Sequence, residues 1–581
     1  MTQQLQGIAA SPGLAIAQAV VLKTETYVPV RSSVEQPEEE VRRFQQAVGQ
    51  AQAEIERIRA ATEEKLGAEK AAIFEGHLLI LEDPDLIDTV TEQIRQEGVQ
   101  AEYALHEVSQ TFIEALSQLD DEMLRERAAD VRDVSGRVLN LLRGVQGGDL
   151  SQLTEACIII AEDLSPSDTA QLNLDAVKGF VTEIGSRTSH SAIMARSLDI
   201  PAIVGVGSRI GDIWSGVTVI MDASEGILLV DPSQEELALY QEKKAEYDKR
   251  KAELRQWVSR PTLSSDGHRV ELAANIGKLE DVQKALDNGA EAIGLFRTEF
   301  LYMGRSELPT EDEQFASYKY VLEKMEGKPV VIRTLDIGGD KELPYLDLPK
   351  ESNPFLGQRA LRLCLERPDV FRTQLRALLR ASAYGNLKIM FPMVAVVEEL
   401  EEAKRMLEDE KRQLVASGAP VADTIEVGMM IEVPSAAIAA DIFAREVDFF
   451  SIGTNDLIQY TMAADRMNET VSYLYQPSHP SILRLIRHVI DSAREQGKWV
   501  GVCGEMAGDL TAIPLLLGLG LHEFSMSAGS ILPARERIAA LSHAEWKTGA
   551  QQALKLRSHQ DVQAFVQDQL KGEPHHDHSI V

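Results

Sequence analysis

One histidine in the N-terminal half of the chain is set among side chains that bind anions. His190 follows residues 179–183, which are predicted to form a short buried strand, and precedes apolar residues at helical spacing. Thr188 or Ser189 would cap that helix, which places His190 in its first turn. A helix N-terminus stabilises anions, Arg187 adds hydrogen-bond donors, and a neutral imidazole can act as a nucleophile. The chemistry that this pattern predicts is a phosphoryl group carried on His190.

The local pattern also allows a plainer interpretation, because a histidine near a helix start is usually a capping or core-edge residue. The longer sequence motif around His190 decides between these two interpretations. Residues 188–196 read Thr-Ser-His-Ser-Ala-Ile-Met-Ala-Arg, and residues 201–205 read Pro-Ala-Ile-Val-Gly. This string closely resembles the phosphohistidine domain of the phosphoenolpyruvate-utilising enzymes, which include Enzyme I of the sugar phosphotransferase system, phosphoenolpyruvate synthase and pyruvate phosphate dikinase. The resemblance implies that His190 is the phosphorylated residue and that Thr169 helps to orient it.

Polar residues recur in the C-terminal half, each at the end of an apolar run. Eight such runs alternate with helical stretches over about 300 residues, which predicts a (β/α)₈ barrel. The expected strands are residues 270–274, 292–296, 330–332, 387–391, 427–431, 449–452, 499–502 and 523–526. The residues that follow them are Asn275, Arg297, Arg333, Pro392-Met393, Glu432, Asn455-Asp456, Cys503 and Ser527. Because the carboxyl ends of barrel strands meet at one mouth, we expect these side chains to form one site.

The charges expected at this mouth define a ligand. Glu432 and Asp456 are oxygen ligands that suit Mg²⁺, with substrate oxygens and water in its other positions, and Mn²⁺ suits them as well. Asn455 can donate to a phosphate. Each residue alone could belong to a structural salt bridge, but together they predict a small substrate with both phosphate and carboxylate. The arginines that could clamp its two anionic groups are Arg297, Arg333, Arg359 and Arg466.

The motifs around these residues resemble the same family. The resemblance implies that phosphoenolpyruvate binds at the mouth with Mg²⁺ held by Glu432 and Asp456, and that His190 attacks its phosphorus. It also implies that Cys503 is the general acid that protonates the enolate; on the sequence alone this cysteine could be a buried apolar thiol. The motifs are residues 295–300 (Leu-Phe-Arg-Thr-Glu-Phe), 332–341 (Ile-Arg-Thr-Leu-Asp-Ile-Gly-Gly-Asp-Lys), 353–357 (Asn-Pro-Phe-Leu-Gly), 431–434 (Ile-Glu-Val-Pro), 451–457 (Ser-Ile-Gly-Thr-Asn-Asp-Leu) and 503–505 (Cys-Gly-Glu).

The elements that must position these residues form a multidomain α/β protein. Residues 1–22 predict one or two strands around a turn, and the sheet they need resumes only beyond residue 155. Between them, apolar residues recur every three or four positions and predict four helices with a break at Asp83-Pro84, so the helices form an insertion. The expected domains are a phosphohistidine α/β domain at 1–22 and 148–231, an inserted α-helical bundle at 23–147, a linker helix at 232–260, a (β/α)₈ barrel at 261–572 and a disordered tail at 573–581.

Charge is uneven within the insertion. Between Ala71 and Asp130 there are fifteen acidic residues and three basic ones. Such a surface can be a solvated helix face, or it can dock a small basic protein and set the rate and orientation of association. The resemblance implies the second and identifies the partner as HPr, the histidine-containing phosphocarrier protein. The charged linker helix would act as a hinge that lets the His190 domain move between two stations.

Domain order separates the members of the family. The synthase and the dikinase carry an ATP-grasp domain ahead of the phosphohistidine domain, whereas here that domain begins at residue 1 and no Walker motif is present. The chain thus looks like Enzyme I, which phosphorylates its own histidine from phosphoenolpyruvate, passes the group to HPr in the first step of sugar uptake, and forms a homodimer through its barrel. Two rival interpretations are an ATP-coupled dikinase or synthase fragment and a non-enzymatic sensor of phosphoenolpyruvate.

Composition excludes other classes of protein. The net charge of −32 over 581 residues argues against nucleic acid as a partner. Cys157, Cys364 and Cys503 form no disulfide or zinc pattern and fit a reducing compartment. The N-terminus does not resemble a signal peptide, and no apolar run approaches the length of a membrane span. We therefore expect a cytoplasmic protein.

Overall fold

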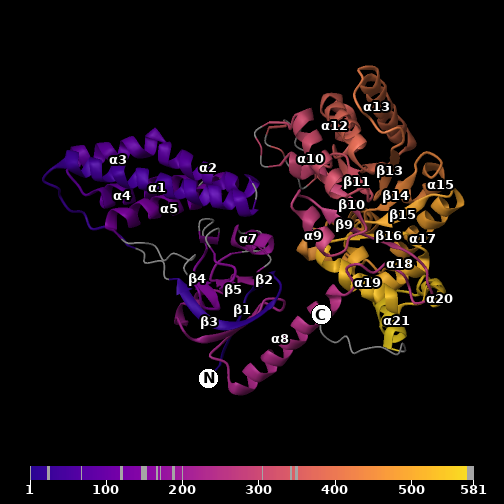
Figure 1. The fold of residues 1–581 in the computed structure, drawn as a ribbon, viewed down its shortest axis with the longest axis horizontal. Coiled ribbons are helices and arrows are strands. Elements are labelled where there is room, and N and C mark those ends of the chain that lie inside the picture. The colour runs from indigo at the N-terminus through magenta and orange to yellow at the C-terminus, as the bar shows by residue number, and fades with distance from the viewer. Residues whose placement is uncertain are drawn as a thin grey trace. The chain divides into compact units, whose positions relative to one another are not determined.

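The computed structural model divides the chain into two compact units, Met1–Arg250 and Lys251–Val581 (Figure 1). The structure describes residues 2–22, 27–66, 68–117, 122–144, 153–164, 168–169, 172–185, 190–198, 200–303, 305, 307–339, 343, 345–346, 351–466 and 468–571. Three predictions fall outside these residues: the caps Thr188 and Ser189, the donor Arg187, and the tail at 573–581.

The described part of the first unit contains an eight-stranded mixed sheet. Its strands are β1 (Gln3–Gln6), β2 (Ile8–Ser11), β3 (Leu14–Leu22), β4 (Cys157–Ala161), β5 (Val177–Thr182), β6 (Ala202–Val204), β7 (Thr218–Asp222) and β8 (Ile227–Val230). Their order is β1-β8-β7-β3-β4-β5-β6-β2, so the first strands interleave with those beyond residue 155. Three strands form where the sequence predicts one or two. The sequence does not predict β1 as a separate strand, because only Leu5 among its residues is buried.

Helix α7 (His190–Leu198) follows β5 and packs against β2 and β6. Its Ala192 and Ala195 are fully buried and join a core cluster that includes Phe180 of β5. These two small residues, three positions apart, let the helix lie close to the sheet. His190 is therefore the first residue of a helix whose opposite face is fixed in the core.

Between β3 and β4 the described residues form a bundle of five helices with a shared apolar core. The sequence predicts four. The additional helix begins at Pro84, where Asp83 accepts a hydrogen bond from Asp85 N at 2.8 Å, because proline at the first helical position starts a helix as readily as it ends one. Val99, expected in a helix, instead pairs with Ser33 in an isolated bridge. The helices are α1 (Pro37–Leu66), α2 (Ala68–Glu82), α3 (Pro84–Glu97), α4 (Ala101–Ser117) and α5 (Glu122–Arg143).

Helix α8 (Gln234–Arg255) follows β8, where the sequence predicts a linker helix. Most of its side chains are exposed. The hydroxyl of Ser233 caps it by accepting from Glu236 N at 3.2 Å, and the Glu236 carboxylate accepts from the Thr2 hydroxyl at 2.5 Å. The start of α8 is thus tied to the first residues of the chain.

The second unit is built on a closed barrel of eight parallel strands, in which β16 pairs with β9. The strands are β9 (Glu271–Ile276), β10 (Ala292–Arg297), β11 (Val330–Arg333), β12 (Leu387–Phe391), β13 (Glu426–Ile431), β14 (Phe449–Ile452), β15 (Trp499–Val502) and β16 (Glu523–Met526). The predicted (β/α)₈ fold is confirmed. Asn275, expected after the first strand, lies inside β9. Its side-chain amide donates to the carbonyl oxygen of Cys503 at 2.9 Å and so links β9 to the chain after β15.

Helices alternate with the barrel strands along the chain. They are α9 (Asp281–Asp287), α10 (Glu311–Lys324), α11 (Leu361–Glu366), α12 (Pro368–Ala381), α13 (Val397–Ala416), α14 (Pro434–Ile438), α15 (Ala440–Phe443), α16 (Thr454–Met462), α17 (Pro480–Glu495), α18 (Ile513–Leu519), α19 (Ile531–Ala540), α20 (His543–Ala553) and α21 (His559–Lys571). Throughout the described residues, no helix combines the length and the apolar character needed to cross a membrane.

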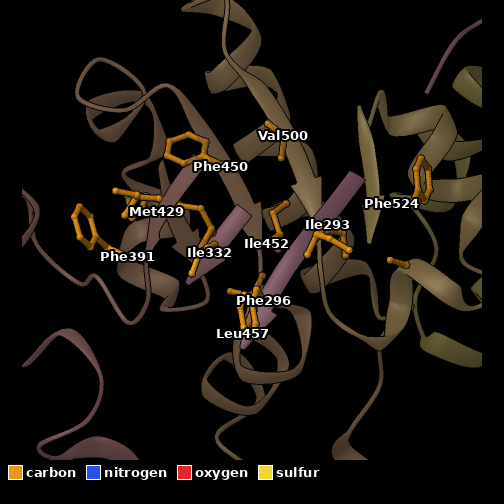
Figure 2. Close-up of a cluster of buried hydrophobic side chains, with 14 of the residues drawn as sticks. Ile293, Phe296, Ile332, Phe391, Met429, Phe450, Ile452, Leu457, Val500 and Phe524 are labelled. Atoms are coloured by element: carbon orange, nitrogen blue, oxygen red, sulfur yellow. The ribbon is translucent and has the colours of Figure 1, made fainter. Parts of the chain in front are cut away.

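Successive strand residues face opposite sides of the barrel wall. Ile332 and Phe391 belong to the large cluster between strands and outer helices, part of which Figure 2 shows. Their neighbours Val331 and Met390 belong to a separate small cluster with Cys503, inside the barrel. Because this alternation has a period of two, a shift of one residue would exchange the two faces. The register that buries the outer cluster therefore also fixes which side chains face inward near the mouth.

Candidate active site

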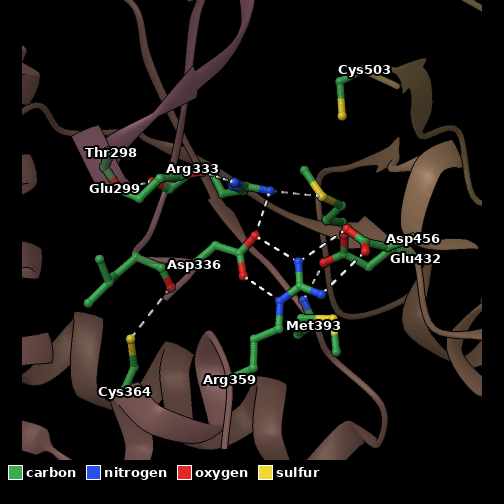
Figure 3. Close-up of polar contacts among 12 residues, drawn as sticks. Thr298, Glu299, Arg333, Asp336, Arg359, Cys364, Met393, Glu432, Asp456 and Cys503 are labelled. Atoms are coloured by element: carbon green, nitrogen blue, oxygen red, sulfur yellow. Dashed lines mark hydrogen bonds and ion pairs between the residues drawn. The ribbon is translucent and has the colours of Figure 1, made fainter. Parts of the chain in front are cut away.

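The carboxyl ends of the barrel strands bring together the charged residues that the sequence singles out. Arg297 and Arg333 are the last residues of β10 and β11. Glu432 follows β13, Asp456 lies in the first turn of α16 after β14, and Cys503 follows β15. Figure 3 shows Arg333, Glu432, Asp456 and Cys503 in the same part of the barrel, and Arg333 interacts electrostatically with both Glu432 and Cys503. The prediction of a shared mouth thus holds for these residues.

Arg359 lies at the centre of a buried ion network. Its Nε and Nη2 donate to the two carboxylate oxygens of Asp336 at 2.9 and 3.1 Å. Its Nη1 and Nη2 also donate to the two oxygens of Asp456 at 3.3 and 3.1 Å, and Nη1 donates to Tyr460 Oη at 3.1 Å. The side chain is 2% exposed. This network holds Asp456 at the mouth in a fixed orientation.

Arg333 extends the same network toward β10. Its Nη2 donates to Glu299 Oε1 at 2.6 Å, and its Nη1 lies 3.1 Å from Asp336 Oδ2. Burial by itself would lower the pKa of Arg333, but the carboxylates of Glu299, Asp336 and Glu432 outweigh it and raise that pKa. The guanidinium therefore stays charged although it is buried.

Several residues of this site are absent from the set predicted by sequence. Glu299 and Asp336 lie within the motifs but are not assigned a role there, and their position just after a barrel strand is the signal that could have found them. Gln374 of α12 had no such signal. It accepts from Leu335 N at 2.9 Å and donates to Thr298 Oγ1 at 3.1 Å, which joins the chain after β10 to the chain after β11.

Glu432 is the carboxylate best suited to a cation. It is completely buried, its Oε1 accepts from Met393 N at 2.7 Å, and among the described residues its Oε2 has no hydrogen-bond donor. Burial, followed by the nearby carboxylates of Asp456 and Asp336, raises the pKa of Glu432 to about 7. A buried oxygen without a donor, beside a second carboxylate, fits Mg²⁺, which usually takes one or two carboxylates and keeps substrate oxygens and water.

Arg297, Arg466 and Asn455 retain donors for a ligand. Within the described part of the chain, neither arginine forms an ion pair, and Arg466 Nε is buried without a hydrogen-bond partner. Asn455 Oδ1 accepts from Tyr475 Oη at 2.9 Å, which turns the amide so that its NH₂ group remains to donate. These three side chains can therefore bind anionic groups directly.

Cys503 carries the thiol of the site. The side chain is buried, and its Sγ lies 3.8 Å from the carbonyl oxygen of Ile452, to which it donates. Burial raises the pKa of the Cys503 thiol to about 11. At neutral pH the group is therefore protonated, as a proton donor must be.

His190 belongs to the first unit. It begins α7, and the N-terminus of a helix carries the positive end of the helix dipole. Thr169, the expected orienting residue, is buried. Sequence and structure thus agree that His190 starts a helix.

Comparison with known proteins identifies the class to which this fold and site belong. Residues 251–543 match the PEP-utilising enzyme, PEP-binding domain. Residues 6–127 match the PEP-utilising enzyme, N-terminal, and residues 153–226 match the PEP-utilising enzyme, mobile domain. The chain belongs to the family of phosphoenolpyruvate-utilising enzymes.

Individual relatives are similar along nearly the whole chain. A phosphoenolpyruvate-protein phosphotransferase of Bacillus subtilis (strain 168) is 59% identical, over 98% of this chain and 100% of its own. One of Geobacillus stearothermophilus is 60% identical, over 97% of both. An NMR solution structure of Enzyme I is 43% identical and covers 42% of this chain and 99% of its own, with a TM-score of 0.38.

Proposed function

We propose that this chain is a phosphoenolpyruvate–protein phosphotransferase. It takes the phosphoryl group of phosphoenolpyruvate onto His190, releases pyruvate, and passes the group to HPr in the first step of sugar uptake by the phosphotransferase system. The observation that supports this most directly is the barrel mouth, where arginines without ion pairs, a carboxylate suited to a cation and a protonated thiol stand together. Relatives with this activity in their names match the chain over nearly its whole length.

The substrate is held by donors that the network leaves available. Arg297, Arg466 and Asn455 bind its phosphate and carboxylate, and Arg333 and Arg359 add positive charge from within the ion network. Positioning and electrostatics supply most of the rate enhancement in such a transfer.

Glu432 and Asp456 would hold Mg²⁺. When bound, the ion would neutralise charge on the transferring phosphoryl group. Glu432 contributes the oxygen that has no donor, and Arg359 keeps Asp456 oriented beside it.

The proton and phosphoryl transfers involve two residues of the chain. The imidazole of His190 forms a bond to phosphorus while the bond from phosphorus to the enol oxygen breaks, and the electron pair remains on the enolate. The Cys503 thiol then donates its proton to the enolate carbon, which gives pyruvate. The thiolate regains a proton from solvent before the next cycle.

The domain assignment follows from these roles. Residues 1–22 and 148–231 form the phosphohistidine domain, 232–260 the linker and 261–572 the phosphoenolpyruvate-binding barrel, and 23–147 dock HPr. Exposed carboxylates gather along the end of α2 and the length of α3, and Leu79 beside them is 65% exposed. This surface suits a small basic partner. The carboxylates are Glu82, Asp83, Asp85, Asp88 and Glu92.

The barrel also forms the homodimer in this proposal, and the protein acts in the cytoplasm. Ile438 and Ile442 are 65% and 51% exposed, and the Ser435 hydroxyl donates to Ala395 O at 3.0 Å, which brings exposed Val396 to the same patch. Ile438→Asp should shift analytical ultracentrifugation from dimer toward monomer without changing phosphoenolpyruvate affinity. A variant that sediments as wild type would place the interface elsewhere.

The test uses phosphoenolpyruvate labelled on phosphorus, with Mg²⁺ and without nucleotide, on wild type and His190→Ala. Acid-labile label on wild type alone, with release of pyruvate and transfer of label to added HPr, is expected. Phosphoenolpyruvate binding without label would favour a sensor. Label that appears only with ATP would favour a dikinase or synthase.

A further inference from the structure

One buried arginine holds the segment after α8 on the barrel. Arg535 of α19 is 1% exposed, and its Nη1 donates to the carbonyl oxygens of Trp257 and Val258 at 2.9 and 3.1 Å. Its Nη2 donates to the carbonyl oxygen of Gly289 at 2.6 Å, and its Nε donates to Thr262 Oγ1 at 3.1 Å. The guanidinium thus joins the end of the linker to the turn after α9.

The residues that contact the Arg535 guanidinium pack closely around it. Gly289 has φ of +72°, and a Cβ there would lie 2.3 Å from Val258 O and 2.7 Å from Arg535 Nη1. The carboxylate of Glu291 lies 3.9 Å from Arg535 Nη2. Most of the close partners of the guanidinium are therefore backbone carbonyl oxygens. A buried charge is costly compared with an apolar side chain of similar volume. Packing alone therefore does not account for an arginine here.

The chain remains fixed to the barrel beyond this point. The carboxylate of Asp266 accepts from His543 N and Ala544 N, at 3.0 and 2.9 Å, and so caps α20. The rings of His268 and His543 stack with their centroids 3.8 Å apart. Upstream of Trp257, in contrast, most side chains of α8 are exposed, and the two compact units divide within this helix. The chain from Trp257 onward is thus anchored to the barrel by hydrogen bonds.

We propose that Arg535 is a positioning residue for phosphoryl transfer. By fixing the C-terminal end of α8 to the barrel, it sets the point and direction from which the unit that bears His190 is tethered. The inference rests on the proposed function, because it requires His190 to reach the barrel mouth. Misplacing reacting groups by about 1 Å can cost roughly a hundredfold in rate, so a loosened tether should slow this step.

The test compares full-length Arg535→Lys and Gly289→Ala with wild type. The lysine keeps the charge but loses the forked donors, and the alanine displaces Val258 O from the other side of the contact. Arg484→Ala is the control, since Arg484 also donates to a carbonyl oxygen within the barrel unit, that of Leu554, and does not contact the linker. Each protein is assayed for phosphoenolpyruvate affinity, for single-turnover labelling of His190 by phosphoenolpyruvate, and for labelling of His190 by phosphorylated HPr.

In both test variants, labelling by phosphoenolpyruvate should slow by about tenfold or more, because positioning is impaired. Affinity for phosphoenolpyruvate and labelling by phosphorylated HPr should stay as in wild type and in the control. Unchanged labelling by phosphoenolpyruvate, or a proportional loss of affinity, would overturn the positioning role. A wild type that takes label from neither donor would overturn the proposed function itself, and this inference with it.

Discussion

The thiol of Cys503 keeps its proton well above neutral pH because it is buried. Cys503→Ala should therefore slow pyruvate formation by about 10²- to 10⁴-fold, the usual contribution of a general acid, while label still passes between His190 and HPr. Cys364→Ala is the matched control, because Cys364 is a buried thiol on α11 whose Sγ donates to Leu335 O. If both half-reactions of the Cys503 variant fall together, the acid role is wrong.

Glu523 is a buried carboxyl group whose titration should make stability depend on pH. It is 2% exposed and lies opposite Glu271 in the pairing of β16 with β9. Burial, and then the charge of Glu271, raises the pKa of Glu523 well above 4.5. Its contribution to the free energy of unfolding is therefore complete below pH 4.5 and is lost as pH rises through the raised pKa.

Glu523→Gln removes this titration. The pH dependence of chemical unfolding should become flatter in the variant than in wild type, with its largest relative gain at the alkaline end. If the free energy of unfolding depends on pH equally in the variant and in wild type, Glu523 is not the group that titrates.

At the scale of elements, Asp336 joins the loop after β11 to Arg359 and, through it, to α16. Its carboxylate lies 3.1 Å from Arg333 and 2.9 Å from Arg359. Asp336→Ala leaves two buried guanidinium groups short of a partner and should cost about 3–5 kcal/mol in urea unfolding. Asp369→Ala removes an exposed ion pair with Arg367 and should cost at most about 1 kcal/mol. Equal losses would mean that the network does not hold these elements.

The strands and helices that the sequence predicts correctly are those with a strong local signal. Apolar runs that alternate with helical stretches locate the barrel strands, and the ends of these runs locate Arg333 and Glu432. Gln374 could not be found in this way, because its role depends on partners brought together only by the fold. The hydrogen bonds of Arg359 to both Asp336 and Asp456 likewise depend on residues that only the tertiary structure brings together. The helix at α3 is missed because proline marks either end of a helix.

At the scale of the whole molecule, α8 joins the two compact units. Inserting four residues after Tyr247 would lengthen the helix by roughly 6 Å and rotate one end by about a ninth of a turn. Transfer from phosphoenolpyruvate to His190 should become slower, while transfer from phosphorylated HPr and the unfolding of each unit stay unchanged. A Gly-Ser insertion after Gly418, in the turn after α13, is the control. Normal transfer in the lengthened protein would rule out α8 as the hinge.

The pairing of β1 with β8 has a practical consequence for engineering this protein. Gln3 lies opposite Val230, and Thr2 bonds to Glu236 in the first turn of α8, so the N-terminal residues sit at the root of the helix. A purification tag or fluorescent protein fused there would be attached at the start of α8, and it should slow phosphoryl transfer if this helix is the hinge. A small spectroscopic probe at the same place would instead report directly on the angle at which the helix departs from the sheet.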